Sequence, residues 1–222
     1  MSGDIFKSHI KMLAIKTVKY YVKPAVFLLG LMPLLLIIGD LFEITGNLGA
    51  NPIENMQDRF GIWGLRFIVT VLMISPLRSI TGFAWITQFR RMIGLYAFFY
   101  VLMHFLVWLL LEQNLLMAAI IEDIATRPFI TIGFIALLIL VALASTSTMN
   151  IRKKMRNNWV RLHSSIYLAS ILGVWHFWWQ VKKDITEPLI YAIIISILLL
   201  YRLRKNTDIP SKKKPCNAGF FV

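Results

Sequence analysis

Long apolar runs separated by short polar segments dominate this chain. A helix needs about 20 apolar residues to cross the hydrocarbon core of a bilayer. Backbone groups inside that core must satisfy their own hydrogen bonds, which favours helices. The pattern therefore predicts an all-α fold, an integral membrane six-helix bundle. The predicted spans are residues 24–42, 62–80, 92–111, 129–147, 159–179 and 188–203.

The polar segments between these runs predict two further features. Residues 47–57 contain the turn markers Gly49 and Pro52 and are expected to be irregular. Residues 115–124 alternate apolar and acidic side chains at helical spacing, which favours a helix lying in the membrane interface. No internal repeat is apparent along the chain.

The composition agrees with a membrane protein and excludes some kinds of site. Of the 222 residues 58% are hydrophobic and only 16% are charged, too little polar surface for a soluble globule. Cys216 is the only cysteine, so no disulfide can form within the chain. There is no Cys-x-x-Cys-His motif, so any haem would be held without a covalent link.

The charged residues orient the predicted bundle. Of the 24 Lys and Arg, 19 lie on the side of the two termini, whereas nine of the eleven Asp and Glu lie on the opposite side. Segments rich in Lys and Arg stay in the cytoplasm, so both termini are predicted to be cytoplasmic, which requires an even number of spans. The chain then divides into a basic cytoplasmic segment (1–23), a transmembrane domain (24–204) and a basic cytoplasmic tail (205–222). The net charge of +13 indicates topology and attraction to anionic lipid, and we expect no nucleic-acid binding.

Three of the four histidines lie inside the predicted spans. An ionisable side chain within a membrane is costly and by default marks a functional site, and imidazole is a usual ligand of haem iron. His104 and His176 fall in the outer halves of the third and fifth spans, which run in the same direction. At about 1.5 Å rise per residue both reach a similar depth, within reach of one iron between the helices.

His163 belongs to a different level of the bundle. It precedes His176 by 13 residues, about 20 Å along the helix, so it cannot bind the same iron. The two also face different sides of an ideal helix, so a second haem depends on a bend or on a sideways displacement. For each histidine the alternative is a structural role, hydrogen-bonded to a neighbouring helix. His9, outside the spans, is expected to play no part.

Three arginines are further candidates for binding a cofactor. Arg66 stands near the outer end of the second span, at a depth suited to a haem propionate. Arg90 and Arg91 open the third span on the inner side, where they could bind an anionic cofactor through charge-assisted hydrogen bonds. The alternatives are snorkelling to the interface for Arg66 and cytoplasmic anchoring for Arg90 and Arg91.

Motifs for substrate chemistry are missing. The sequence has no glycine-rich nucleotide loop, no His-x-x-x-His pair on one helix and no nucleophile elbow. We therefore expect no catalytic residues. Electrons would have to come from a lipid quinol or from a separate reductase.

Several stretches, taken in order, resemble a known family. They are LGANP at 48–52, SPLR at 75–78, RRMIGL at 90–95, TRPFITIG at 126–133, STST at 145–148, WVRLHSSIYL at 159–168 and HFW at 176–178. They are similar to the MsrQ family, the haem-binding membrane subunits of the bacterial periplasmic methionine-sulfoxide reductase system. The similarity covers roughly residues 31–204.

The resemblance implies a fold and cofactors. It implies a ferric-reductase-like transmembrane domain, related to the membrane part of NADPH oxidases, that holds haem b and also FMN. His104, His163 and His176 match the histidines of the family one for one. The related oxidases carry two histidines on each of two helices, and this chain departs from that pattern because Arg90 or Arg91 stands where the inner partner of His163 would be.

The resemblance also implies a role in the bacterial inner membrane. Electrons would be taken from the respiratory quinone pool, or from a cytosolic flavin reductase. They would pass to a periplasmic molybdopterin-containing catalytic subunit of the MsrP type that repairs oxidised methionine in proteins. Two alternatives stay open: a ferric or other metal reductase of the same fold, and a haem-free transporter whose histidines relay protons.

Overall fold

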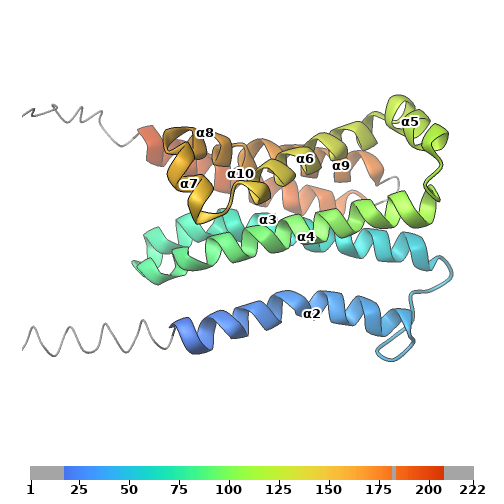
Figure 1. Ribbon diagram of the computed structural model, residues 1–222, viewed down its shortest axis with the longest axis horizontal. Coiled ribbons are helices and arrows are strands. Elements are labelled where there is room, and N and C mark those ends of the chain that lie inside the picture. The colour runs from blue at the N-terminus through green and yellow to red at the C-terminus, as the bar shows by residue number, and fades with distance from the viewer. Residues whose placement is uncertain (1–17, 182–183, 208–222) are drawn as a thin grey trace, which may run out of the picture.

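The computed structural model describes residues 18–181 and 184–207, which are almost entirely helical (Figure 1). His9 and most of the predicted cytoplasmic segments at 1–23 and 205–222 lie outside the described residues. In chain order the helices are η1 (Val18–Val22), α2 (Lys23–Leu41), α3 (Pro52–Thr81), η2 (Ala84–Phe89), α4 (Arg90–Val107), η3 (Trp108–Glu112), α5 (Met117–Thr126), α6 (Pro128–Ser145), α7 (Met149–Met155), α8 (Asn157–Ser164), α9 (Ile166–Gln180) and α10 (Thr186–Thr207).

Five stretches in the described part of the chain are long and apolar enough to cross a membrane. They are Tyr20–Leu41, Pro52–Thr81, Ala84–Glu112, Pro128–Ser145 and Thr186–Arg204. They correspond to five of the six predicted spans, and the described residues contain no strand. The prediction of an all-α, multi-pass membrane protein is therefore confirmed.

The predicted span at 159–179 differs from the other five because it is interrupted. Helix α8 ends at Ser164 and α9 begins at Ile166, so neither helix alone is long enough to span. The hydroxyls of Ser164 and Ser165 donate to the carbonyls of Arg161 and Leu162, at 2.5 and 2.6 Å. Such local bonds compete with the helical ladder and bend helices. The predicted span at 159–179 is thus divided between two helices that meet at Ser165, and whether they cross the membrane together stays a prediction.

Helix α3 begins ten residues before the predicted second span. Pro52 occupies its first turn, where the missing N–H of proline costs nothing, and Glu54 suits the positive end of the helix dipole. The expectation of an irregular segment over 47–57 was therefore wrong beyond Asn51. The polar first turns of α3 escaped the hydrophobic pattern because charged side chains interrupt it there. Helix α5 confirms the short helix predicted at 115–124.

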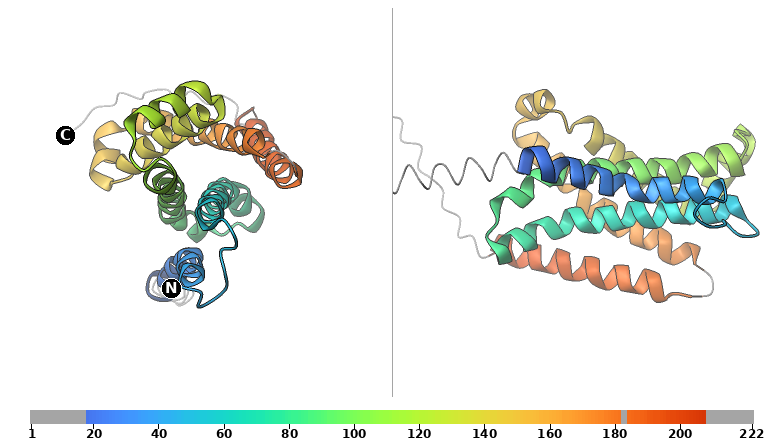
Figure 2. Two further views of the ribbon diagram at one scale, coloured as in Figure 1. Left: turned by 90° about the vertical axis from the view of Figure 1, so that its right-hand side faces the viewer. Right: turned by 90° about the horizontal axis from the view of Figure 1, so that it is seen from below.

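Helices α3, α4, α6 and α9 form the centre of the bundle, and the long helices α2 and α10 lie outside it (Figure 2). Helix α3 packs along α4, α6 packs along α9, and these two pairs meet through α4 with α6 and α3 with α9. Helix α10 covers α3 and α9, and α2 lies against α3 and α4 at the far edge. Helices α4 and α9 run in the same direction, as predicted (Figure 1).

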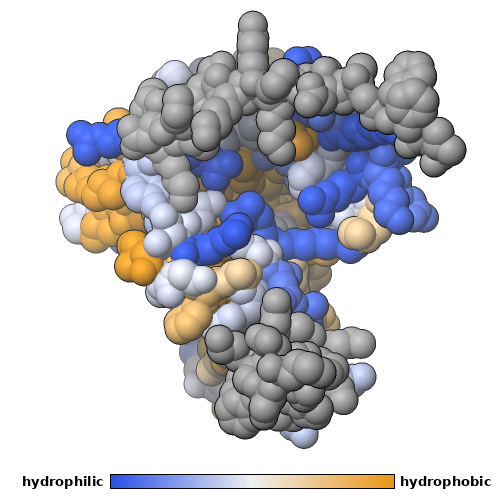
Figure 3. Space-filling view, turned by 90° about the vertical axis from the view of Figure 1, so that its left-hand side faces the viewer, coloured by the Kyte–Doolittle hydropathy of each residue, from blue (hydrophilic) through white to orange (hydrophobic). Residues whose placement is uncertain are grey.

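The two ends of the bundle carry opposite charges. We call the end with Arg78, Arg90, Arg152 and Arg202 the basic end, and Figure 3 shows hydrophilic side chains gathered at the centre of this face. The opposite end, here called the acidic end, carries Asp40, Glu54, Asp58, Glu112, Asp123, Asp184 and Glu187. Helix α2 begins and α10 finishes at the basic end (Figure 1).

Helix α2 is held to the bundle by two tyrosines of α4. The fully buried hydroxyl of Tyr100 donates to the Gly30 carbonyl at 2.8 Å and accepts from the Leu34 N–H at 3.1 Å, so it inserts into the helical ladder of α2. Pro33 already weakens that ladder because it lacks an N–H. Tyr96 adds a hydrogen bond to the Phe27 carbonyl at 2.7 Å. These bonds attach α2 without making it part of the central four helices.

Candidate functional site

A cavity of about 1100 Å³ lies among the four central helices. Its walls within the bundle are apolar and include Ile68, Val101, Leu137 and Leu140. Toward the acidic end the lining becomes polar. The cavity thus joins a dry interior to one charged end of the bundle.

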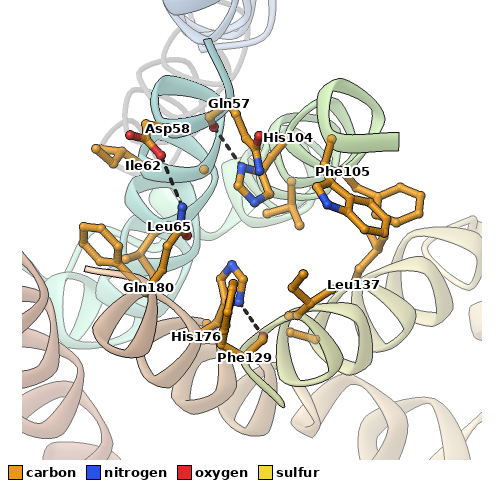
Figure 4. A pocket seen from close by; sticks show the side chains of 18 of the residues that line it. Gln57, Asp58, Ile62, Leu65, His104, Phe105, Phe129, Leu137, His176 and Gln180 are labelled. Atoms are coloured by element: carbon orange, nitrogen blue, oxygen red, sulfur yellow. Dashed lines mark hydrogen bonds between the residues drawn. The ribbon is translucent and has the colours of Figure 1, made fainter. Parts of the chain in front are cut away.

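His104 and His176 face one another across this cavity (Figure 4). Their ring centres are 6.0 Å apart, and the ring planes are nearly perpendicular, at 84°. A metal–imidazole bond is about 2.0–2.1 Å and a ring nitrogen lies about 1.1 Å from the ring centre, so two imidazoles on one metal have centres about 6 Å apart. The structure therefore brings the predicted pair together at the spacing that one shared metal ion requires.

Backbone carbonyls fix the orientation of both rings. His104 Nδ1 lies 2.8 Å from the Gln57 carbonyl oxygen on α3, and His176 Nδ1 lies 2.7 Å from the Phe129 carbonyl oxygen on α6. A carbonyl can only accept, so Nδ1 carries the hydrogen and Nε2 keeps its lone pair. A hydrogen bond of this kind, from the second ring nitrogen, orients metal-binding histidines in general.

Two glycines make room for these contacts. A Cβ at Gly61 would stand 2.9 Å from His104 Nδ1, and a Cβ at Gly133 would stand 2.7 Å from His176 Nδ1. In each half of the site the glycine follows the carbonyl residue by four positions. Any larger residue would push the imidazole away from its carbonyl. The glycines are thus required by the close approach of a ring to a helix backbone.

The two halves of the site repeat one arrangement. Each histidine lies 47 residues after the carbonyl that orients it, once from α3 to α4 and once from α6 to α9. Deeper in the bundle, residues of all four helices, among them Ile68, Ala97, Leu140 and Ala169, belong to one buried cluster. The two halves of the site therefore share this spacing, although no internal repeat is apparent in the sequence.

The rim of the cavity is acidic, with one cation. Among the described residues that line it, Arg127 is the only Lys or Arg, whereas Glu54, Asp58, Glu112, Asp184 and Glu187 are acidic. Arg127 pairs with Asp123 at 3.3 Å. An anionic group of a cavity ligand would therefore find its positive partner at Arg127. The sequence reasoning did not identify this residue.

Arg66 is not brought to the cavity. Its Nε donates to the hydroxyl of Tyr191 on α10 at 3.1 Å, and its guanidinium lies over the Trp63 ring at 4.7 Å. These contacts hold it at the seam between α3 and α10. The predicted contact of Arg66 with a propionate thus finds no support in this geometry.

His163 occupies a separate site on α8, as its position in the sequence predicts. Its ring stacks on Trp159 with centres 3.9 Å apart, and Nε2 lies 3.1 Å from the Thr146 hydroxyl. That hydroxyl donates its one hydrogen to the Ala142 carbonyl at 2.7 Å, so it accepts from His163 Nε2. In His163 the Nε2 atom is therefore occupied by a hydrogen bond, whereas in His104 and His176 the same atom keeps its lone pair.

Arg90 and Arg91 differ in their surroundings. Arg90 Nη2 donates to the Ser75 hydroxyl at 2.8 Å, and Arg202 Nη1 donates to the same oxygen at 3.0 Å. Arg91 is an exposed residue of the same helix turn. Neither arginine lines the cavity that holds the histidine pair. They belong to the basic end of the bundle.

The two histidines suit a metal that a cofactor already coordinates through most of its positions. Among the described residues no group of three or more His, Cys, Asp or Glu could hold a bare metal ion. Two imidazoles with free Nε2 atoms on opposite sides of an apolar cavity instead match the axial positions of a haem. The cavity volume, the two glycines and Arg127 at the rim are consistent with that ligand.

Comparison with known proteins agrees with this geometry. Residues 60–174 match the family described as "Ferric reductase like transmembrane component". A protein of Xanthomonas euvesicatoria pv. vesicatoria is 48% identical over 158 residues, which cover 71% of this chain and 72% of that protein. One of Ralstonia nicotianae is 41% identical over 185 residues, 82% and 84% of the two chains. Both relatives are named "Protein-methionine-sulfoxide reductase heme-binding subunit MsrQ".

Proposed function

Because this chain belongs to the MsrQ family, within the ferric-reductase-like transmembrane proteins, we propose that it binds haem and transfers electrons across a membrane. The observation that carries the proposal is the pair His104 and His176, oriented by carbonyls and spaced for one metal. A haem bound there would supply a one-electron carrier. The chain itself would hold the iron, exclude water and set the depth of the carrier in the bilayer.

The direct test is haem content. His104→Ala and His176→Ala should each remove most of the Soret band and of the dithionite-induced α band from the purified protein. His9→Ala, which removes a histidine outside the predicted spans, should leave both bands unchanged. Haem retained at the wild-type level in both site variants would overturn the assignment.

The cofactors beyond that pair are also part of the proposal. We assign haem b, since nothing in the chain can link a haem covalently, and FMN because the family resemblance implies it. His163 marks an inner site whose occupant would have to displace Thr146 from Nε2. Haem and flavin per chain in wild type and in His163→Ala would show what binds there.

The orientation we propose places the basic end in the cytoplasm, with both termini inside and α8 and α9 together making a sixth crossing. The boundaries 1–23, 24–204 and 205–222 follow from this topology. The only cysteine, Cys216, then lies in the cytoplasmic tail. A membrane-impermeant maleimide should label it only after the cells are permeabilised, whereas a cysteine replacing Leu116 in a Cys216→Ser background should be labelled in intact cells.

With this orientation the histidine pair lies toward the periplasm. The proposed donors are the quinone pool or a cytosolic flavin reductase, and the proposed acceptor is a periplasmic molybdopterin-containing MsrP-type subunit in the bacterial inner membrane. Deleting the gene should abolish repair of periplasmic methionine sulfoxide. Loss of iron reduction with intact repair would instead indicate a metal reductase, and colourless protein after expression with ample haem would indicate a proton-relaying transporter.

A further inference from the structure

The basic end of the bundle contains a cluster that the histidine site does not explain. Arg90 at the start of α4 and Arg202 near the end of α10 both donate to the hydroxyl oxygen of Ser75 on α3. Arg202 also lies over the ring of Tyr167 on α9, at 5.1 Å. Three helices, α3, α4 and α10, thus meet at one hydroxyl group, and Arg202 extends the cluster to α9.

The convergence of two guanidinium groups is unfavourable by itself. Arginines that only anchor a helix extend separately toward water and lipid headgroups. Here two permanently charged groups approach one small neutral acceptor, and Arg78 lies within electrostatic range of Arg90 as well. Such an arrangement is stable when a negative charge lies between the cations.

The described part of the chain supplies no carboxylate at this end. The sequence has no Asp or Glu between Asp58 and Glu112, between Asp123 and Asp184, or between Glu187 and Asp208. Every described acidic residue therefore lies in or next to a segment at the acidic end. No described residue therefore supplies a counter-charge for Arg90 and Arg202, which leaves this place open to a negatively charged ligand.

We propose that Ser75, Arg90 and Arg202 form a binding site for a phosphate group. Planar guanidinium groups bind phosphate oxygens in pairs of hydrogen bonds, which makes arginine a preferred residue for this ligand. The Ser75 oxygen acts as acceptor in both arginine contacts, so its hydroxyl hydrogen can serve as a third donor. The phosphate belongs either to a flavin mononucleotide or to the headgroup of an anionic phospholipid. The flavin source rests on the FMN of the proposed function, whereas the lipid source does not, and neither depends on the haem.

The first arm of the test compares two flavins on the full-length protein in detergent. FMN carries a phosphate and riboflavin does not, so fluorescence titration with both isolates the contribution of that group. The double variant Arg90→Gln/Arg202→Gln should weaken FMN binding by roughly tenfold or more, since two charge-assisted hydrogen bonds are lost, and leave riboflavin binding unchanged. Inorganic phosphate should compete with FMN in wild type.

The second arm measures lipid. Phosphatidylglycerol retained by the purified protein, quantified by mass spectrometry, should fall in the double variant if a lipid headgroup is the source. The double variant Lys154→Gln/Arg161→Gln, at two exposed inner-side residues outside the cluster, removes the same number of charges and serves as the matched control in both arms. The Soret band of each sample reports separately whether the bundle and its haem site are intact.

The outcomes separate the possibilities. A loss of FMN affinity confined to the double variant supports a flavin phosphate, and a loss of phosphatidylglycerol with unchanged FMN affinity supports a lipid phosphate. Wild-type FMN affinity together with wild-type lipid content in the double variant would overturn the proposal. Equal losses in Lys154→Gln/Arg161→Gln would also overturn it, since they would show an effect of net charge alone.

Discussion

Replacing Gly133 by alanine tests the histidine geometry with the smallest available change. The new Cβ would stand 2.7 Å from His176 Nδ1 and 2.9 Å from Cε1, whereas ordinary contact begins at 3.4 Å. The ring would therefore have to move by about 0.7 Å. Metal sites keep their ligand distances to within about 0.2 Å. A shift of this size also lengthens and weakens the hydrogen bond to the Phe129 carbonyl, and such a bond contributes about 0.5–1.5 kcal/mol.

We expect Gly133→Ala to lose most of its haem or to retain haem with only one histidine bound. The corresponding change at Gly61 requires a smaller movement, about 0.5 Å, and should have a weaker effect in the same direction. Haem per chain by pyridine haemochrome, with the low-spin signal in electron paramagnetic resonance, measures both. The order of the two effects follows from the two distances alone.

Gly94→Ala provides the control on the same bundle. Its Cβ would meet only Val71 Cγ2, at 3.9 Å, so it fits without movement. This variant should bind haem like wild type and be slightly more stable, since alanine favours helices over glycine by about 1 kcal/mol. A Gly133→Ala protein with wild-type haem content and spectrum would refute the close-approach argument.

Three further predictions concern other parts of the chain. Tyr100→Phe removes the hydroxyl that bridges α2 to α4 and should cost about 1–3 kcal/mol of stability, seen as a lower melting temperature in detergent, while the exposed Tyr21→Phe changes nothing. Arg127→Gln removes the one Lys or Arg among the described residues that line the cavity. It should lower the haem midpoint potential by tens of millivolts, a Coulomb effect of about 1 kcal/mol. An unchanged potential would show that Arg127 does not interact with the haem. At the acidic end, hydrogen bonds from the Thr186 hydroxyl and N–H hold the pKa of Asp184 below its ordinary value. Because the pKa of Asp184 is lower in the folded state, its carboxylate stabilises the start of α10 fully above about pH 4, and this stabilisation is lost as the pH falls. Hydrogen exchange of the first turn of α10 should therefore become faster at low pH. Asp184→Asn should abolish this pH dependence.

Hydrophobic patterning predicted the fold class and the position of most helices because the bilayer imposes a length and a polarity on every crossing. It failed where polar side chains act locally. Ser164 and Ser165 interrupt a span that is apolar enough to be read as one helix, and the first turns of α3 extend beyond the apolar run. Two serines do not alter the apolar character of the first segment, and the charged side chains in the first turns of α3 hide a helix that continues through them.

The histidine pair was predictable from depth alone, because two parallel helices with a known rise place their residues by counting. The groups that orient the pair were not. Gln57 and Phe129 act through their carbonyls, which no side-chain pattern reveals, and Arg127 reaches the rim only through the turn before α6. One sequence signal could have identified the glycines, because Gly61 precedes His104 by the same number of residues as Gly133 precedes His176.

The paired arrangement of carbonyl, glycine and histidine has a consequence for how the protein assembles. Each helix pair, α3 with α4 and α6 with α9, contains one histidine together with the carbonyl that orients it. Neither pair alone can therefore hold a metal between two histidine ligands. The proposed haem would bind only the docked pair, and by mass action it would stabilise docking more as its concentration and affinity rise. Cofactor supply would then govern how much of the newly inserted chain closes into the native bundle. Protein made without its cofactor should separate along the seam between the two helix pairs first.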